Sequence, residues 1–169
     1  MSQHSIIRYL KVADGVTILS LLSGFAAIIY FTHGNFFNGS LALIAAAFLD
    51  WIDGKVARAL GGGTDFGKAL DFSDLVSFGV APAFLVATLV PGTFGYFSAG
   101  IFLTASLLRL ARFNVTKDDV SLGMPTTFNG IIFPAMYFVQ NYFYFTSYAF
   151  PIAALASSAL MLSSFRLGK

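Results

Sequence analysis

Residues 15–49 read GVTILSLLSGFAAIIYFTHGNFFNGSLALIAAAFL and contain no Asp, Glu, Lys or Arg. These 35 residues exceed the roughly 20 that one helix needs to cross a bilayer. The polar group Thr32-His33-Gly34-Asn35 divides the run near its middle. The stretch therefore predicts a hairpin of two transmembrane helices.

Two further runs without charge, 75–108 and 120–165, follow the first and are 34 and 46 residues long. Each is again too long for one span, so each predicts another helical hairpin. Three hairpins make an all-α integral membrane protein with six transmembrane helices. The expected spans are 15–32, 37–59, 69–90, 94–115, 127–145 and 148–166.

The composition fits a chain that lies in a membrane. Hydrophobic residues make up 57% and charged residues 11%, against about 25% charged in soluble domains. There is no cysteine, which excludes disulfide frameworks and thiolate metal sites. The composition also argues against a disordered chain and a soluble nucleic-acid binder. At 169 residues we expect one domain, 1–169.

All ten basic residues lie outside the three runs or at their ends. With six spans, every Lys and Arg falls on one side, which the positive-inside rule assigns to the cytoplasm. We therefore expect a multi-pass protein of the cell membrane with both termini cytoplasmic. Residues 1–12 alternate apolar and basic groups and fit either a short helix on the cytoplasmic surface or a frayed tail.

Four aspartates gather on the cytoplasmic side. Asp50 and Asp53 are spaced i,i+3 on a helix, as are Asp71 and Asp74, so each pair shares one helix face. The glycines at 61–63 let the chain turn back, which places the two pairs opposite each other. Carboxylates without nearby His or Cys favour Mg²⁺ or Mn²⁺, and two such ions fit the site.

A simpler interpretation is that these carboxylates are solvated by headgroup water or paired with Lys55, Arg58 and Lys68. Against it, Asp71 and Asp74 continue without a break into an apolar run. An ionisable group within a span is costly and indicates function.

Small and basic residues flank the aspartates. Gly54 and Ala57 open one helix face, either for helix packing or for a ligand to approach the backbone. Arg58 either holds a phosphate or reaches to the interface. Arg109 and Arg112 end the fourth span, where they either grip a carboxylate or only fix topology.

The pattern Asp-x2-Asp-Gly-x2-Ala-Arg-x8-Gly-x3-Asp, from Asp50 to Asp71, resembles the signature of the CDP-alcohol phosphatidyltransferases. The resemblance implies a homodimer with six transmembrane helices that acts on a CDP-lipid. It implies two divalent cations, Mg²⁺ or Mn²⁺, and a general base, Asp74. It further implies metal ligands at Asp50, Asp53, Asp71 and Asp74, and CDP-lipid contacts at Gly54, Ala57, Arg58 and Gly67.

One spacing departs from the family pattern, which ends Asp-x3-Asp. Here Asp71-Phe72-Ser73-Asp74 has one residue fewer, which changes the azimuth by about 100° on an ideal helix. Either a local helix irregularity restores the position of Asp74 or the site is impaired.

The flanking sequence is similar to the phosphatidylserine synthase branch, through the run from Leu75 to Ala83 and through Arg109 to Asn114. In members with phosphorylated acceptors, a basic residue stands at the position of Leu75. The resemblance thus implies transfer of a phosphatidyl group from CDP-diacylglycerol, or an archaeal CDP-ether lipid such as CDP-archaeol, to L-serine, with release of CMP. Arg109 and Arg112 would bind the acceptor.

Two alternatives remain open. One is transfer to glycerol 3-phosphate or an inositol phosphate within the same family. The other is a cation or proton transporter that uses the aspartate cluster.

Overall fold

The computed structural model describes residues 12–59, 72–115, 123–143 and 146–164. This part of the chain is entirely helical. Its elements are α1 (Val12–Thr32), α2 (Phe36–Ala59), the π-helix η2 (Leu75–Val80), α4 (Ala81–Leu89), α5 (Thr93–Val115), the 3₁₀-helix η3 (Thr126–Phe128), α6 (Asn129–Phe143) and α7 (Ala149–Leu162).

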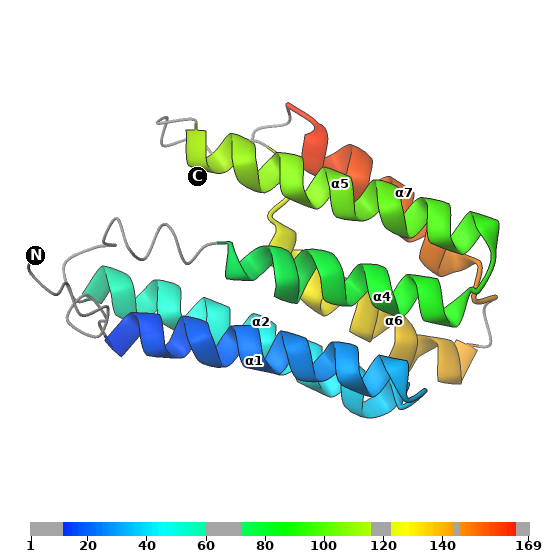
Figure 1. The fold of residues 1–169 in the computed structure, drawn as a ribbon, viewed down its shortest axis with the longest axis horizontal. Helices are drawn as coiled ribbons and strands as arrows, with labels where there is room; N and C mark the ends of the chain where they lie inside the picture. The colour runs from blue at the N-terminus through cyan, green and yellow to red at the C-terminus, as the bar shows by residue number, and fades with distance from the viewer. Residues whose placement is uncertain (1–11, 60–71, 116–122, 144–145, 165–169) are drawn as a thin grey trace, which may run out of the picture.

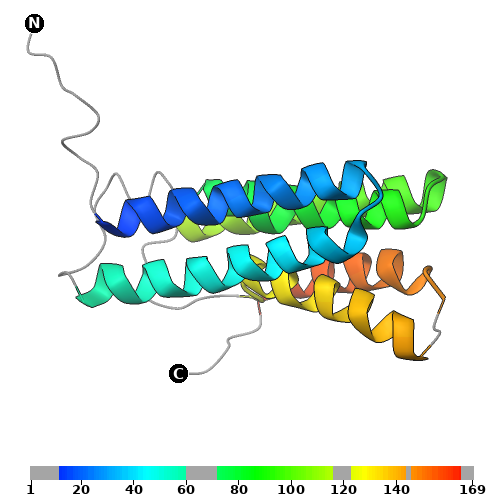
Figure 2. The same ribbon diagram turned by 90° about the horizontal axis from the view of Figure 1, so that it is seen from below.

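The helices form three pairs that lie side by side (Figure 1): α1 with α2, α4 with α6, and α5 with α7. Turned by 90°, the same bundle shows two layers (Figure 2). One layer holds α1, α4 and α5, and the other holds α2, α6 and α7. Each layer has one helix in its middle, α4 in the first and α6 in the second, and each of these contacts the helices on either side of it.

Three helices are long and apolar enough to cross a membrane: Asp14–Thr32, Phe36–Val56 and Thr93–Val115. Leu75–Leu89 and Ala149–Leu162 are shorter apolar helices. The predicted all-α fold is thus confirmed for the described residues, and three of their helices are compatible with membrane spans. The number of crossings and the side of the termini stay predictions, and residues 1–11 of the expected surface helix lie outside the described part.

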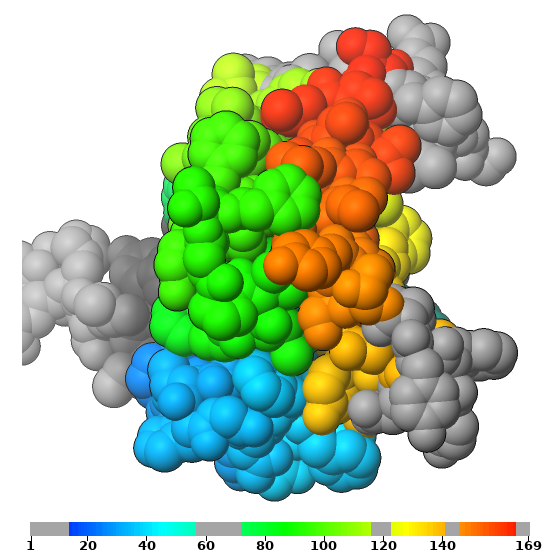
Figure 3. Space-filling view, turned by 90° about the vertical axis from the view of Figure 1, so that its right-hand side faces the viewer, coloured from blue at the N-terminus to red at the C-terminus, as the bar shows by residue number. Residues whose placement is uncertain are grey.

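Two turns lie at the end of the bundle that Figure 3 faces, where α1 (blue) meets α2 (cyan) and α4 meets α5 (green). Gly34, with φ +72°, and Gly92, with φ +127°, adopt backbone angles that favour glycine. These turns fall where the sequence predicts the hairpins to reverse.

The core combines large aromatic rings with small residues that let helices approach. Phe102 and Phe133 are fully buried and pack edge to face, with ring centroids 5.3 Å apart. A Cβ on Gly24 of α1 would lie 2.7 Å from the Cα of Ser77 in η2, so these two backbones are in direct contact. Small residues at such crossings are typical of membrane helix packing.

The third predicted span, 69–90, differs from a regular α-helix in its described part. The turn from Leu75 to Val80 is a π-helix, and the backbone N–H of Ala81 donates to the carbonyl of Val76. Pro82 follows directly, and its ring would clash with the carbonyl of Phe78 in a regular α-helix. The wider π-turn relieves that clash, and it lies immediately after Asp74, where the sequence has one residue fewer than the family pattern.

Candidate active site

Two of the predicted aspartates, from separate elements, meet at one end of the bundle. Asp50 lies in the last part of α2, and Asp74 immediately precedes η2. Their carboxyl groups lie within hydrogen-bonding reach of each other. The hydroxyl of Thr127, in η3, donates to Asp50 Oδ2 at 3.0 Å. The Asp50 carboxylate is therefore held by a hydroxyl 77 positions away in the sequence.

Asp53 lies one turn further along α2 and is held from α1. The hydroxyl of Thr17 donates to Asp53 Oδ2 at 2.7 Å. Both carboxylates of the i,i+3 pair therefore accept a hydrogen bond from a threonine of another element. Such bonds to a charged acceptor orient the carboxylate and contribute about 1.5–3 kcal/mol each.

A pocket of about 900 Å³ opens beside these carboxylates, between α2 and the segment formed by η3 and α6. Asp50, Asp53 and Gly54 line its polar end, and the rest of its wall is mostly apolar. The other lining residues are Ile44, Ala47, Phe48, Trp51, Pro125, Thr127, Phe128, Ile131 and Ala135. The pocket is therefore suited to an amphipathic molecule with a polar head and an apolar body.

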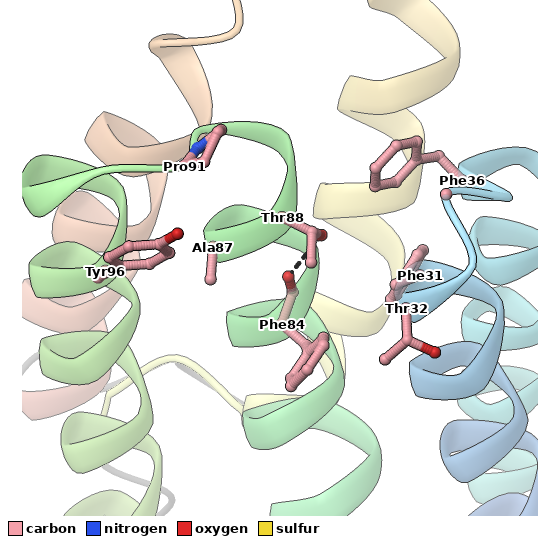
Figure 4. A pocket seen from close by; sticks show the side chains of 9 residues that line it. Phe31, Thr32, Phe36, Phe84, Ala87, Thr88, Pro91 and Tyr96 are labelled. Atoms are coloured by element: carbon pink, nitrogen blue, oxygen red, sulfur yellow. Dashed lines mark hydrogen bonds between the residues drawn. The ribbon is translucent and has the colours of Figure 1, made fainter.

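A second pocket, of about 570 Å³, lies beside the turns at the opposite end (Figure 4). The Thr88 hydroxyl donates to the carbonyl of Phe84, and the Thr32 hydroxyl donates to that of Ile29. The lining residues include no charged side chain: Phe31, Thr32, Gly34, Phe36, Phe84, Ala87, Thr88, Pro91 and Tyr96. Among its lining residues no carboxylate or imidazole is present, so the pocket with the aspartates is the candidate site.

Arg109 of α5 is a buried cation whose charge acts on one of the carboxylates. Only 9% of its surface is exposed, and its charge interacts with that of Asp74. Its guanidinium donates to the hydroxyl of Thr126 at 3.5 Å and lies 5.5 Å from the ring centre of Phe113. A buried arginine beside an acidic group is suited to binding a carboxylate or a phosphate.

Arg112, the second predicted acceptor residue, has a different environment. Its guanidinium donates to the carbonyl oxygens of Met161 at 2.9 Å and of Leu162 and Ser163 at 3.3 Å. These carbonyls lie at the C-terminal end of α7, where a cation is favourable. Arg112 thus ties α5 to α7, whereas the charge of Arg109 interacts with that of Asp74.

Part of the predicted site lies beyond what the structure describes. Asp71 and Gly67 are outside the described residues, and Ala57 and Arg58 lie in α2 with side chains that are not described. Within the described ranges, no three carboxylate or imidazole groups are placed to hold a metal ion by themselves. The available donors are carboxylate oxygens, which fit Mg²⁺ or Mn²⁺.

The sequence prediction missed the three threonines of the site. Thr17 lies one turn after Asp14 on α1, and Thr126 and Thr127 follow Pro125. A signal was present, because each hydroxyl lies next to a predicted span end at the depth of the aspartates. Hydroxyl groups are common in membrane helices, and only the fold shows which carboxylate each one meets.

Comparison with known proteins shows that the similarity to one family covers most of the chain. The model of the CDP-alcohol phosphatidyltransferase family matches residues 10–165. The chain is 32% identical over 166 residues to the CDP-diacylglycerol–serine O-phosphatidyltransferase of Methanocaldococcus jannaschii, covering 98% of this chain and 77% of that protein. The enzyme of the same name from Bacillus subtilis is 34% identical over 132 residues, 75% of each chain.

A third relative has a different name. The archaetidylserine synthase of Methanothermobacter thermautotrophicus is 30% identical over 174 residues, covering 97% of this chain and 72% of that protein. The family model, which matches residues 10–165, covers the helices that carry every described residue of the site. The chain is therefore a transferase that belongs to the CDP-alcohol phosphatidyltransferase family.

Proposed function

We propose that the protein transfers the phosphatidyl group of CDP-diacylglycerol, or of its ether-lipid counterpart, to the hydroxyl of L-serine. The observation that carries this proposal is the buried Arg109, whose charge interacts with that of Asp74, which in turn interacts with Asp50. A cation and carboxylates at one site suit an acceptor that brings both a carboxylate and an ammonium. The similarity to relatives named CDP-diacylglycerol–serine O-phosphatidyltransferase supports the same acceptor.

The CDP-lipid would enter from the bilayer through the pocket between α2 and α6. Its apolar wall, which includes Phe48 and Ile131, suits the lipid tails, and its acidic end suits the headgroup. Gly54, at that end, has no side chain to obstruct the nucleotide. Ala57, Arg58 and Gly67 complete the proposed CDP-lipid contacts.

The acceptor would bind on the side of α5. Arg109 offers a planar fork of donors that matches the carboxylate of serine. Leu75, the first residue of η2, adds no charge to attract a phosphate there. Arg112 supports this arrangement by holding α7 against α5.

In the proposed reaction, the serine hydroxyl oxygen attacks the lipid-bearing phosphorus of the CDP-lipid. A new phosphorus–oxygen bond forms, the bond to the CMP oxygen breaks, and CMP leaves with that electron pair. Asp74 accepts the hydroxyl proton as general base. Because serine is a weak nucleophile, positioning by Arg109 and proton removal by Asp74 contribute most from this chain's own residues.

Asp50, Asp53, Asp71 and Asp74 are the proposed ligands of two divalent cations. When bound, such ions neutralise a pyrophosphate and stabilise the leaving nucleotide. We further place the site at the cytoplasmic face of the cell membrane, as the distribution of Lys and Arg predicts. A homodimer, which the family resemblance implies, is part of the same proposal.

The direct test is CMP release by purified protein in detergent with CDP-diacylglycerol and Mn²⁺ or Mg²⁺. L-serine, glycerol 3-phosphate and inositol 1-phosphate are compared as acceptors. We expect that, of the three acceptors, only L-serine supports CMP release, and that the Asp74→Asn variant does not release CMP. Release with glycerol 3-phosphate instead would assign a different acceptor, and metal flux in sealed vesicles without CMP release would assign a transporter.

A further inference from the structure

One connecting segment, residues 123–128, contacts α7, Arg109 of α5 and Asp50 of α2. At its start, Gly123 has φ +74°, and the Met124 backbone N–H donates to the Leu160 carbonyl at 3.2 Å. A Cβ on Gly123 would lie 2.9 Å from Arg112 Nη2 and would contact the backbone of α7. The segment is therefore anchored against α7 and Arg112 before it reaches the site.

Two adjacent threonines then point to the two halves of the site. Thr126 is 2% exposed and accepts a hydrogen bond from Arg109, on the side proposed for the acceptor. Thr127 lines the large pocket and donates to Asp50, on the side proposed for the CDP-lipid. The short 3₁₀-helix η3 separates successive side chains by about 120°, which lets neighbours face different partners.

We propose that the 123–128 segment is the positioning element of the reaction, with Thr127 holding the carboxylate of Asp50 and Thr126 holding the guanidinium of Arg109. This inference rests on the proposed function for the identity of the two ligands. One short turn thereby fixes the distance between Asp50, on the side of the phosphates, and Arg109, on the side of the acceptor. A displacement between them would raise the barrier, because in-line attack requires reacting atoms to be held in close alignment.

The two threonines are expected to act on different kinetic constants. Thr127→Val removes the hydrogen bond to Asp50 with little change in shape, and we expect kcat to fall roughly tenfold to hundredfold. We also expect weaker Mn²⁺ binding, measured directly by electron paramagnetic resonance without substrate. Thr126→Val should instead raise the KM for serine several-fold and leave Mn²⁺ binding unchanged.

Serine variants and a distant threonine provide the controls. Thr127→Ser and Thr126→Ser keep the hydroxyl and should restore values close to those of the unmodified protein. Thr104→Val removes an exposed hydroxyl that bonds only within α5, to the carbonyl of Gly100, and should change neither constant. A role limited to folding would lower activity and thermal stability together in the Val and Ser variants alike.

The outcomes separate this inference from the proposed function. Unchanged kcat and Mn²⁺ binding in Thr127→Val, or equal loss in Thr127→Ser, would overturn the positioning role. If the unmodified protein releases no CMP with serine but Thr127→Val still weakens Mn²⁺ binding and Thr127→Ser restores it, the positioning role stands and the proposed acceptor is wrong.

Discussion

Replacing Gly24 with alanine is expected to lower both the stability and the activity of the protein. Gly24 lies where α1 crosses η2, and an added Cβ would lie 2.7 Å from both the Cα and the Cβ of Ser77. Ordinary contact begins at 3.4 Å, so the backbone of Ser77 must retreat by more than half an ångström. The bond from Ser77 Oγ to the Ser20 carbonyl, 3.3 Å long, would be strained by the same movement.

The magnitude follows from two opposed effects. Overpacking at a rigid contact costs about 1–3 kcal/mol, whereas alanine gains up to about 1 kcal/mol of helix propensity over glycine. We therefore expect a net loss of roughly 1–2 kcal/mol at Gly24. Ser77 is three residues from Asp74, so the same displacement moves Asp74 relative to Asp50 and should reduce kcat.

Gly100 of α5 provides a matched control, because nothing lies within 4 Å of its added Cβ. Gly100→Ala should be neutral or slightly stabilising. The assay is thermal unfolding in detergent together with CMP release, where about 1 kcal/mol corresponds to roughly 2–4 °C for a chain of this length. Equal melting temperatures for Gly24→Ala and Gly100→Ala would refute the close α1–η2 contact.

Three further predictions concern the site and its supports. Arg112→Gln should lower the melting temperature, since three carbonyls at the end of α7 lose a cationic donor, while the KM for serine changes little. Arg109→Lys should raise the KM for serine at least tenfold, because an ammonium cannot reproduce the planar fork; an unchanged KM would remove Arg109 from the acceptor site. Ala135→Trp, which fills the apolar part of the large pocket, should raise the KM for CDP-diacylglycerol and leave that for serine unchanged; a normal KM for the lipid would place the tails elsewhere.

Much of the helical fold is predictable from the sequence. Each run without charge is too long for one span, which predicts a reversal near its middle, and Gly34 and Gly92 lie at two of these reversals. The π-turn was less predictable. It reflects a conflict between Pro82 and the preceding carbonyls, which depends on whether the helix continues through the proline.

The aspartates of the site could be predicted from the sequence, but the roles of the residues that hold them in place could not. The i,i+3 spacing places Asp50 and Asp53 on one face of α2, and the hairpin brings Asp74 to Asp50. The separate contacts of Arg109 and Arg112 could not be predicted from the sequence, because both residues lie near the end of α5, three positions apart. Only the packing shows that Arg112 donates to carbonyl oxygens of α7 while Arg109 donates to Thr126.

We propose that serine, through its hydroxyl oxygen, displaces CMP from the CDP-lipid at this site. The measurement that tests it most directly is the stoichiometry of products with isotopically labelled L-serine, CDP-diacylglycerol and Mn²⁺. We expect one labelled phosphatidylserine for each CMP, no CMP without serine, and neither product from Asp74→Asn. CMP formed without serine, or labelled lipid formed equally well by Asp74→Asn, would contradict it.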